Sequence, residues 1–363
     1  MWKETPVVFA VGNEYQIMIP TECECIMKVE IDGQMYYDAF NGIMRSRCLV
    51  HKVTVPMEVL DKAGAYRVYL QRIVDRKHKF ADMGECESQE FVFLPVSGER
   101  IRAYHIADNH GLIEEAVAAA AAYGEIDFLI LNGDLANNFS EETAVWKVYK
   151  LASAITGGNI PVVMVRGNHD TRGKYAELYE EYFPTMQGST YYTFRLGNIW
   201  GLALDCGEDK EDDHPEYTGL VCCHDFRLRE TEYIKKVIAD AGSEYEAAGV
   251  AHKVVICHIP FTAHGEGIFD IERDIYGEWV GLLRDHIKPE LVISGHEHVW
   301  EVYEVGSEKD NYGQSCPTLV GSALRRANGE HYFAGAGLEF SSEGVKNTFT
   351  DSEWCKKSLE EMM

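Results

Sequence analysis

Residues 161–170 read PVVMVRGNHD, and this stretch decides how the chain around it is interpreted. The apolar run Pro161–Val165 predicts a short strand, and the polar run Gly167-Asn168-His169-Asp170 follows it closely. In open α/β sheets, ligands bind in the crevice beside the carboxyl ends of the strands. The stretch therefore predicts a strand that carries polar side chains to a binding site.

Other polar clusters occupy equivalent positions, each just after an apolar stretch. They are Asp108-Asn109-His110, Gly133-Asp134, His258 and Gly295-His296-Glu297-His298. A single aspartate in such a place is usually a cap or turn residue, and a single histidine usually has a structural role. Clusters at successive strand ends are instead expected to converge. Their oxygen and imidazole donors suit Mn, Fe, Co or Zn better than Mg or Ca.

Predicted helices separate the predicted strands in the second part of the chain. The strands are expected at 102–107, 128–131, 161–165, 199–204, 253–257 and 291–294, and the helices at 112–123, 141–155, 174–183, 227–241 and 278–286. This alternation is typical of an α/β domain with a largely parallel sheet. Beyond His298 we expect closing strands at 302–305 and 319–320, then turns around Gly335 and Gly337. The result would be a four-layer αββα sandwich.

The first part of the chain has a different pattern. Alternating apolar and polar residues at 16–19, 27–31, 65–70 and 90–94 predict short strands, and Asp32-Gly33 and Asn41-Gly42 predict turns between them. Such spacing is typical of a β-sandwich of immunoglobulin or fibronectin type. Because Ser97-Gly98-Glu99 reads as a linker, we predict an all-β domain at 1–98 and a catalytic domain at 99–363.

The ordered series Asp-x-His, Gly-Asp, Gly-Asn-His-Asp, His and Gly-His-x-His resembles the calcineurin-like metallophosphoesterase superfamily. All five motifs are present in this order, over roughly residues 100–345. The preceding β-rich part weakly resembles the N-terminal domain of purple acid phosphatases, by architecture alone. The resemblance implies a dinuclear metal centre, with two divalent or trivalent ions of which Mn, Fe or Zn are favoured.

The resemblance also implies a role for each motif residue. Asp108, His110 and His298 would hold one metal ion, Asn168, His258 and His296 would hold the other, and Asp134 would bridge them. His169 would not bind metal and would act as a general acid or electrophile, oriented by Asp170. A metal-bridging hydroxide would attack phosphorus in line. Purple acid phosphatases place a tyrosine where this chain has Asn137 and lack the histidine of Asp-x-His, so no purple tyrosinate-iron site is expected.

Other polar residues near the motifs are candidate substrate-binding residues. Arg166 and Arg172 flank the Gly-Asn-His-Asp motif and could bind phosphate oxygens, although each could instead form an ion pair. Asn109, Asn137 and Asn138 could line the pocket or simply form turns. His264 could support the centre from the loop after His258. The acidic segment 206–224 is either a lid over the site or a solvated surface loop.

Charge and composition restrict the partners of the protein. The formal net charge of −25 is unfavourable for nucleic-acid polymers and anionic membranes, because binding them needs clustered Lys and Arg. A small phosphorylated substrate remains compatible with it. The start of the chain lacks the basic and apolar pattern of a signal peptide, and the ten cysteines are irregularly spaced, so we expect reduced thiols and a cytoplasmic location.

Two classes of function follow from these observations. The first is metal-dependent hydrolysis of a phosphoric ester by a phosphatase or phosphodiesterase, with no preference for a monoester or a diester visible in the sequence. The alternative is a catalytically inactive phosphoesterase fold that serves as a binding or scaffold protein. Loss of metal-ligand residues would favour this alternative, and every expected ligand type is present.

Overall fold

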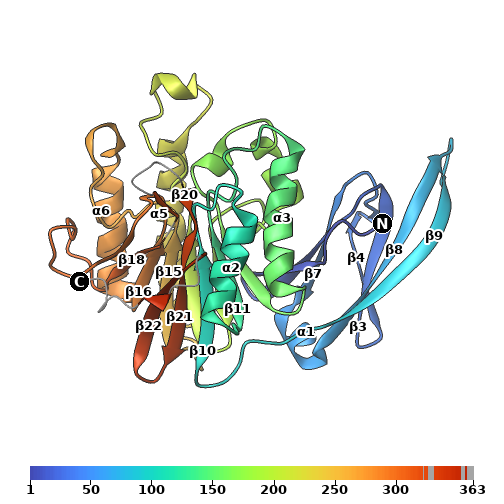
Figure 1. Cartoon of the computed structure of the whole chain (residues 1–363), viewed down its shortest axis with the longest axis horizontal. Helices are drawn as coiled ribbons and strands as arrows, with labels where there is room; N and C mark the ends of the chain where they lie inside the picture. The colour runs from blue at the N-terminus through green and yellow to red at the C-terminus, as the bar shows by residue number, and fades with distance from the viewer. Residues whose placement is uncertain (322, 326–330, 353–355, 358–363) are drawn as a thin grey trace.

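Two large β-sheets packed face to face form the centre of the molecule, and helices cover their outer faces (Figure 1). The computed structural model describes residues 1–321, 323–325, 331–352 and 356–357. The expected αββα layering is therefore confirmed for the second part of the chain. Among the described residues, none of the helices is both long and apolar enough to cross a bilayer.

The larger sheet has nine strands. In spatial order they are β23 (Lys356–Lys357), β22 (Gly344–Asp351), β21 (Ala334–Ser341), β10 (Ile101–Ile106), β11 (Phe128–Asn132), β12 (Pro161–Val165), β1 (Val7–Val11), β2 (Glu14–Pro20) and β7 (Val50–Pro56). Strands β10, β11, β12 and β1 run parallel, whereas the outer strands pair antiparallel.

The second large sheet has six strands. In spatial order they are β13 (Tyr192–Leu196), β14 (Ile199–Leu204), β15 (His252–Cys257), β16 (Leu291–Ser294), β18 (Thr318–Gly321) and β17 (Trp300–Tyr303). Its central strands β14, β15, β16 and β18 are parallel. Smaller sheets pair β4 (Gln34–Tyr37), β3 (Cys25–Ile31), β8 (Ala65–Arg76) and β9 (Ala81–Val92), then β5 (Ala39–Phe40) with β6 (Ile43–Met44), and β19 (Leu324–Arg325) with β20 (His331–Tyr332).

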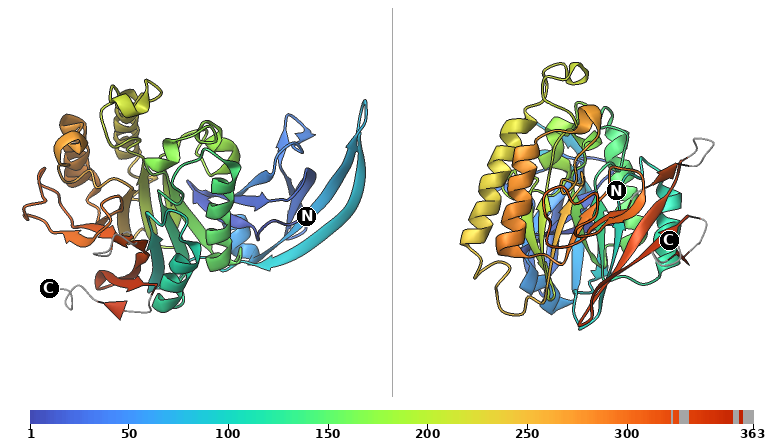
Figure 2. Two further views of the ribbon diagram at one scale, coloured as in Figure 1. Left: turned by 45° about the horizontal axis from the view of Figure 1, so that its top comes forward. Right: turned by 90° about the vertical axis from the view of Figure 1, so that its left-hand side faces the viewer.

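Helices cover both outer faces of the sheet pair (Figure 2). Helices α2 (Ile113–Tyr123) and α3 (Glu142–Thr156) pack on the nine-stranded sheet, and α5 (Cys223–Ala239) and α6 (Arg273–Leu282) pack on the six-stranded sheet. The short helices are α1 (Met57–Ala63) and α4 (Tyr179–Tyr182). Helical turns lie at His169–Thr171, Ala176–Leu178, Pro215–Tyr217, Gly267–Phe269 and Leu283–Ile287. The helix predicted at 174–183 is thus mostly wrong, since only a turn and a four-residue helix form there.

The hydrophobic core between the two sheets continues into the N-terminal region. It includes Val8 and Tyr15 from the N-terminal strands and Val163 and Ile256 from the central strands, all nearly inaccessible to solvent. Apolar residues on both faces of the parallel strands are buried, which explains why those strands read as continuous apolar runs. The core therefore holds the strand ends of both large sheets in fixed relative positions.

The N-terminal region is rich in strands, as expected, but these strands divide between two larger sheets and the small β5–β6 pair. Strands β1, β2 and β7 extend the nine-stranded sheet, with β1 parallel to β12 through Val8–Pro161 and Phe9–Val162. Strands β4, β3, β8 and β9 form a separate sheet, whose long β8–β9 hairpin projects away from the body (Figure 1). The predicted division at residues 98 and 99 stays a prediction, and sheet pairing crosses it.

The predicted turns around Gly335 and Gly337 are wrong. Both glycines lie inside strand β21, which pairs with β10 and β22. A Cβ atom on Gly337 would lie 2.1 Å from the Tyr123 ring, and one on Gly335 would lie 2.6 Å from the Tyr104 hydroxyl. The glycines therefore make room for two tyrosines rather than forming a turn.

Candidate metal centre

The strand ends of the two large sheets bring the motif residues together. Asp108, Asp134 and Asn168 follow β10, β11 and β12 of the nine-stranded sheet. His258 follows β15 and the pair His296 and His298 follows β16, both in the six-stranded sheet. Each parallel strand delivers its polar residues to the same end of its sheet, so the expected convergence is observed.

The backbone at this convergence is strained. Five motif residues have positive φ angles, a conformation that is uncommon for residues with a side chain. They are Asp108 (52°), His110 (44°), Asp134 (54°), His296 (71°) and His298 (54°). Such strain costs of order 1–3 kcal/mol at each residue and clusters at functional sites, where the surrounding structure maintains it.

Glycines allow the motif loops to approach one another closely. A Cβ atom on Gly167 would lie 2.3 Å from Asp134 Oδ1, and one on Gly295 would lie 2.7 Å from Asp108 Oδ2. No larger residue fits at either position without moving a carboxylate of the site. The glycines of these motifs therefore serve packing around the carboxylates.

The side chains of Asp108, His110 and His298 form one group of potential metal ligands, whose donor atoms all lie within 4.8 Å of one another. The rings of His110 and His298 stack with a centroid separation of 5.3 Å. Burial lowers the pKa of His110 to about 4, which keeps its imidazole neutral and able to bind a metal ion at neutral pH. Asp108 contributes a fully buried carboxylate.

A second group comprises Asp134, His258 and His296, again with donor atoms within 4.8 Å. The His258 ring donates from Nδ1 to the Asn132 carbonyl oxygen over 2.6 Å, which leaves Nε2 facing the carboxylates. Nε2 lies 3.3 Å from Asp134 and 3.6 Å from Asp108. Burial lowers the pKa of His258, but these two carboxylates outweigh burial and raise it to about 10. The two carboxylates therefore strongly favour a positive charge at this position.

Asn168 has one end of its amide beside Asp134 and His296 and the other end beside Asp209 and Arg172. With the nitrogen at the first end it would donate to Asp134 and His296, and with the oxygen there it would be a metal ligand. Its Oδ1 lies 3.3 Å from Asp134 Oδ2 and 3.1 Å from His296 Nδ1. Two oxygen acceptors this close repel each other unless a cation lies between them. The amide nitrogen is engaged on the other side, where it donates to Asp209 Oδ2 over 3.3 Å. These donors fit a transition-metal ion with oxygen and imidazole ligands.

His169 lies beside the two groups of potential metal ligands. Its Nδ1 atom is directed away from both of them. That nitrogen donates to the Asn137 carbonyl oxygen over 2.7 Å, so the ring is held with Nε2 directed toward the site. Nε2 lies 3.8 Å from Asp134 Oδ2 and 3.3 Å from Arg172 Nη1. The ring is partly exposed, which suits a group that exchanges protons with a substrate.

Asp170 does not orient His169, and that expectation is wrong. The helical turn at His169–Thr171 sends the two neighbouring side chains in different directions. Asp170 Oδ2 instead accepts the backbone N–H groups of Gly167 and Asp134, at 2.9 and 3.1 Å. Burial and the nearby Asp134 carboxylate raise the pKa of Asp170 to about 7. Asp170 thus ties two motif loops together.

The predicted substrate-binding residues have different surroundings. Arg166 forms a 2.7 Å ion pair with buried Asp205 and contacts the rings of Tyr179 and Phe226, so its guanidinium is directed into the protein. Arg172 binds Glu208 through two hydrogen bonds of 2.8 and 2.7 Å, and its Nη1 faces His169.

The predicted asparagines also differ from one another. Asn109 is fully buried next to Asp108, and neither polar atom of its side chain has a hydrogen-bond partner. Asn137 is exposed and contributes its backbone carbonyl to His169. His264 lies in the cavity wall and contacts the Tyr312 ring.

Sequence reasoning missed two acidic residues of the segment 206–224. Glu208 and Asp209 are both buried, although they lie in an acidic stretch that reads as surface loop. Glu208 binds Thr171 and Arg172, and Asp209 binds Asn168. The one feature of the sequence that could have indicated their role is that the acidic run begins directly after the strand at 199–204. The start of this segment therefore belongs to the site and positions the Gly-Asn-His-Asp loop.

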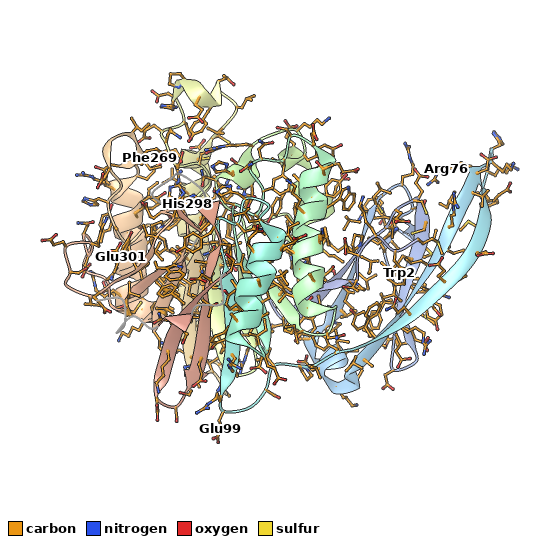
Figure 3. All side chains as sticks on the ribbon, viewed as in Figure 1. Trp2, Arg76, Glu99, Phe269, His298 and Glu301 are labelled. Carbon is orange, nitrogen blue, oxygen red and sulfur yellow. The ribbon has the colours of Figure 1, made fainter. Side chains whose placement is uncertain are left out.

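A cavity of about 410 Å³ opens over the second ligand group. Phe269 and His298, both labelled in Figure 3, contribute to its lining. The wall combines motif residues with an apolar surface and a few polar groups, namely Asp134, Asn168, His169, Asp209, Ile259, Pro260, Phe261, Ala263, His264, Gly265, Glu266, Phe269, Ile271, Tyr276, His296, Glu297, His298, Tyr303 and Lys309. A compact organic group therefore fits beside the converging ligands.

Comparisons with known proteins agree with this site. A purple acid phosphatase from yellow lupin (Lupinus luteus) seeds superimposes with a TM-score of 0.61 at 13% identity, over 96% of this chain and 72% of the other. The structure of PhoD superimposes with a TM-score of 0.52 at 11% identity, over 94% and 91%. At such identities the likeness concerns the fold alone. A search of curated protein sequences gave no match. The family model for calcineurin-like phosphoesterases matches residues 101–300, and the chain belongs to this family.

Proposed function

We propose that this protein is a dinuclear-metal hydrolase of phosphoric esters, acting on a monoester or a diester. The observation that carries the proposal is the pair of adjacent ligand groups, one around Asp108 and one around Asp134, beside a cavity that Asp134, His296 and His298 help to line. Mn, Fe and Zn are the ions we favour, because the groups combine carboxylate, amide and imidazole donors. When bound, two such ions supply an activated water nucleophile and neutralise phosphoryl charge.

The residues of the chain have distinct tasks in this reaction. Asp134 belongs to the second group, and its Oδ2 lies 3.3 Å from His258 Nε2 and 3.8 Å from His169 Nε2, so this carboxylate would help to hold the ions beside the proposed acid. The backbone N–H of His169 donates to Asp134 Oδ1 over 2.9 Å and fixes that carboxylate. Similarly, the backbone N–H of His296 donates to Asp108 Oδ2 over 2.7 Å. These bonds hold both carboxylates before substrate arrives.

His169 is the proposed general acid. Because the Asn137 carbonyl holds its Nδ1 proton, Nε2 is the atom that gains and releases a proton. Arg172 Nη1 lies 3.3 Å from Nε2 and its guanidinium is anchored by Glu208, so it can donate to this nitrogen after Nε2 has given its proton to the leaving oxygen. Protonation of the leaving oxygen by such a group accelerates hydrolysis by roughly 10²–10⁴-fold.

The cavity indicates the size and character of the substrate. Its apolar wall, which includes the aromatic residues Phe261, Phe269, Tyr276 and Tyr303, suits a compact leaving group with an apolar face. Lys309 is a cationic side chain in that wall. The net charge of −25 supports a small phosphorylated molecule rather than a nucleic-acid strand or a membrane surface. We also retain the cytoplasm as the proposed compartment, supported by the free thiols of the described cysteines.

A hydrolysis panel tests the proposal. The full-length protein is stripped of metal, reloaded separately with Mn, Fe, Co, Ni or Zn, and assayed with a nitrophenyl monoester, a nitrophenyl diester and a set of nucleotides. Asp134→Asn is the matched blank, since it keeps the side-chain volume and removes the proposed bridging charge. We expect metal-dependent turnover that falls at least 10³-fold in this variant, whereas circular dichroism shows an unchanged fold.

The panel also separates the enzyme from the inactive scaffold. Undiminished turnover in Asp134→Asn would contradict the proposed centre. Two tightly bound ions without turnover of any ester would favour a binding protein built on a phosphoesterase fold. A preference for the monoester or the diester would define the substrate class.

A further inference from the structure

A separate cluster of metal-binding side chains lies in the N-terminal strands. Asp38 follows β4, Cys48 lies two residues before β7, and His51 is the second residue of β7. Their ligand atoms all lie within 4.8 Å of one another. His51 is fully buried and Asp38 is 4% exposed, whereas Cys48 is partly exposed. None of these residues belongs to the phosphoesterase motifs, and the cluster requires its own explanation.

The three ligand atoms are spaced nearly as in a tetrahedral zinc site, and the Cys48 sulfur, which also lies 3.9 Å from His51 Nε2, would have to move into the plane of the ring beside Nδ1 to complete it. His51 Nδ1 lies 3.0 Å from Asp38 Oδ2, Cys48 Sγ lies 3.6 Å from His51 Nδ1, and Cys48 Sγ lies 3.9 Å from Asp38 Oδ2. Usual zinc bond lengths with tetrahedral angles place N and O ligands about 3.4 Å apart, and S about 3.6 Å from either. All three separations agree with these values within about 0.4 Å.

The surroundings of the cluster hold its members in place. His51 Nε2 lies 3.3 Å from Cys25 Sγ, so the thiol sulfur can accept the second ring proton and leave Nδ1 for a metal ion. A hydrogen bond from the second ring nitrogen is the usual support for a metal-binding histidine. Arg45 lies 3.5 Å from Asp38 Oδ1, the carboxylate oxygen that faces away from His51.

A nucleophilic role for the cluster is less compatible with its burial. Cys25 contacts His51, and His51 contacts Asp38, in the arrangement of a thiol nucleophile, its general base and the acid that orients the base. However, Cys25 and His51 are both 0% exposed, so a substrate cannot reach the sulfur. Cys48 is the partly exposed thiol, and its sulfur lies over the face of the His51 ring, 3.6 Å from Nδ1 and 3.9 Å from Nε2.

We propose that Asp38, Cys48 and His51 bind one zinc-type ion, independently of the phosphoesterase centre. A thiolate, an imidazole and a carboxylate form a ligand set that suits zinc, and the partly exposed Cys48 gives access for the ion and for a water molecule as fourth ligand. His51 belongs to the nine-stranded sheet and Asp38 adjoins the small sheet of β4, β3, β8 and β9. The ion would therefore join the two sheets of the N-terminal region.

Cobalt substitution distinguishes this site from the phosphoesterase centre. The proposed ligands of that centre include no thiolate, whereas Cys48 is a thiolate ligand, so only the new site gives a sulfur-to-cobalt charge-transfer band. We expect full-length protein loaded with Co²⁺ to show this band. Cys48→Ser should abolish it, and Cys222→Ser should retain it as a control for exposed thiols. Full-length His296→Ala should also retain it, because that change affects only the phosphoesterase centre.

Metal analysis and stability complete the test. We expect the zinc-loaded variants Cys48→Ser and Asp38→Asn to contain one zinc ion fewer per chain than the unchanged protein. We also expect a chelator to lower the melting temperature of the unchanged protein more than that of either variant. Absence of the band in the unchanged protein would overturn the proposal and leave a hydrogen-bonded Cys-His-Asp cluster. Loss of the band in Cys25→Ser, with retention in Cys48→Ser, would overturn the ligand assignment. The wild-type spectrum is decisive even if a variant fails to fold.

Discussion

Asp209 shows, at the scale of the residue, how a group outside the motifs can control a metal ligand. Its Oδ2 accepts a hydrogen bond from the Asn168 amide nitrogen, and this bond directs the amide oxygen toward Asp134 and His296. Lys210 and Tyr217 bind the other oxygen of Asp209 at 2.8 Å each, which fixes the carboxylate. The carboxylate thus acts on the centre through its hydrogen bond with Asn168, and it also lies 3.7 Å from Arg172.

We expect Asp209→Asn to lower activity and metal affinity by about 10–100-fold, because loss of an outer hydrogen bond misorients the ligand. Metal affinity by titration calorimetry and kcat/KM with the preferred ester measure this. Asp213→Asn is the matched control, since it changes an exposed carboxylate of the same segment. Equal affinities in the two variants would show that Asp209 has no positioning role.

Glu230 predicts a pH-dependent stability. Its Oε1 accepts the Asp205 N–H over 2.6 Å, and its Oε2 has no hydrogen-bond partner. Burial, with a contribution from Asp205, raises the pKa of Glu230 well above its ordinary value. The folded protein therefore keeps this proton at a pH where the unfolded chain releases it. Stability is lost as pH rises above about 4.3, by up to about 1.4 kcal/mol per pH unit for this group.

Glu230→Gln replaces the titrating carboxyl with a neutral amide. The free energy of unfolding of this variant should therefore rise relative to that of the unchanged protein as the pH increases from 5 to 8. Denaturant unfolding at several pH values measures the difference in free energy of unfolding. Glu232→Gln on the exposed face of the same helix is the control, with a smaller pH dependence expected. A difference that stays constant across this range would contradict the buried neutral carboxyl.

The sequence predicted the centre at the level of residue types and left its orienting contacts hidden. Motif order and strand ends were sufficient to place Asp108, Asp134 and His258 together, because parallel strands end at one edge. Which hydrogen bonds orient His169 and Asn168 depends on side chains and carbonyls brought near by tertiary structure. Asn137 contributes through its backbone, so no side-chain pattern could have revealed it.

At the scale of the element, strand β21 illustrates how packing overrides local propensity. Two glycines usually weaken a strand, yet β21 lies inside the nine-stranded sheet between β10 and β22. The Tyr123 side chain from α2 occupies the space above Gly337. The tyrosine and the glycine therefore compensate each other, and a sequence pattern read along one strand cannot show this.

Gly337→Ala should destabilise the protein by about 1–3 kcal/mol, because its methyl group would overlap the Tyr123 ring. Urea unfolding measures the change in free energy of unfolding. Gly242→Ala is the control, since a Cβ atom there has nothing within 4 Å. A destabilisation equal to that of the control would mean that the ring moves aside freely.

At the scale of the whole molecule, the N-terminal strands complete the sheet of the catalytic part. Strand β1 covers the edge of β12, and Val8, Tyr15 and Phe93 belong to the same core as Val163. The sequence predicted the strands of this region but assigned them to an independent sandwich. Alternation reveals which segments are extended, whereas strand partners depend on contacts that are distant in sequence.

We expect a fragment of residues 101–363 to aggregate, because it exposes the edge of β12 together with apolar core surface. Size-exclusion chromatography of the soluble fraction measures this. Removal of residues 76–81, at the exposed tip of the β8–β9 hairpin, is the matched deletion and should leave a monodisperse, active protein. A monodisperse and active 101–363 fragment would contradict the structural role of the N-terminal strands.

The pairing of β1 with β12 has a consequence for synthesis on the ribosome. Residues 7–11 leave the exit tunnel early, but their parallel partner at 161–165 is translated roughly 8–30 s later. During that interval the apolar segment VVFAV of the nascent chain has β2 as its available partner, which in turn pairs with β7, and its other edge stays open. The segment is therefore a natural client site for cotranslational chaperones, and slow decoding before residue 165 would lengthen its exposure.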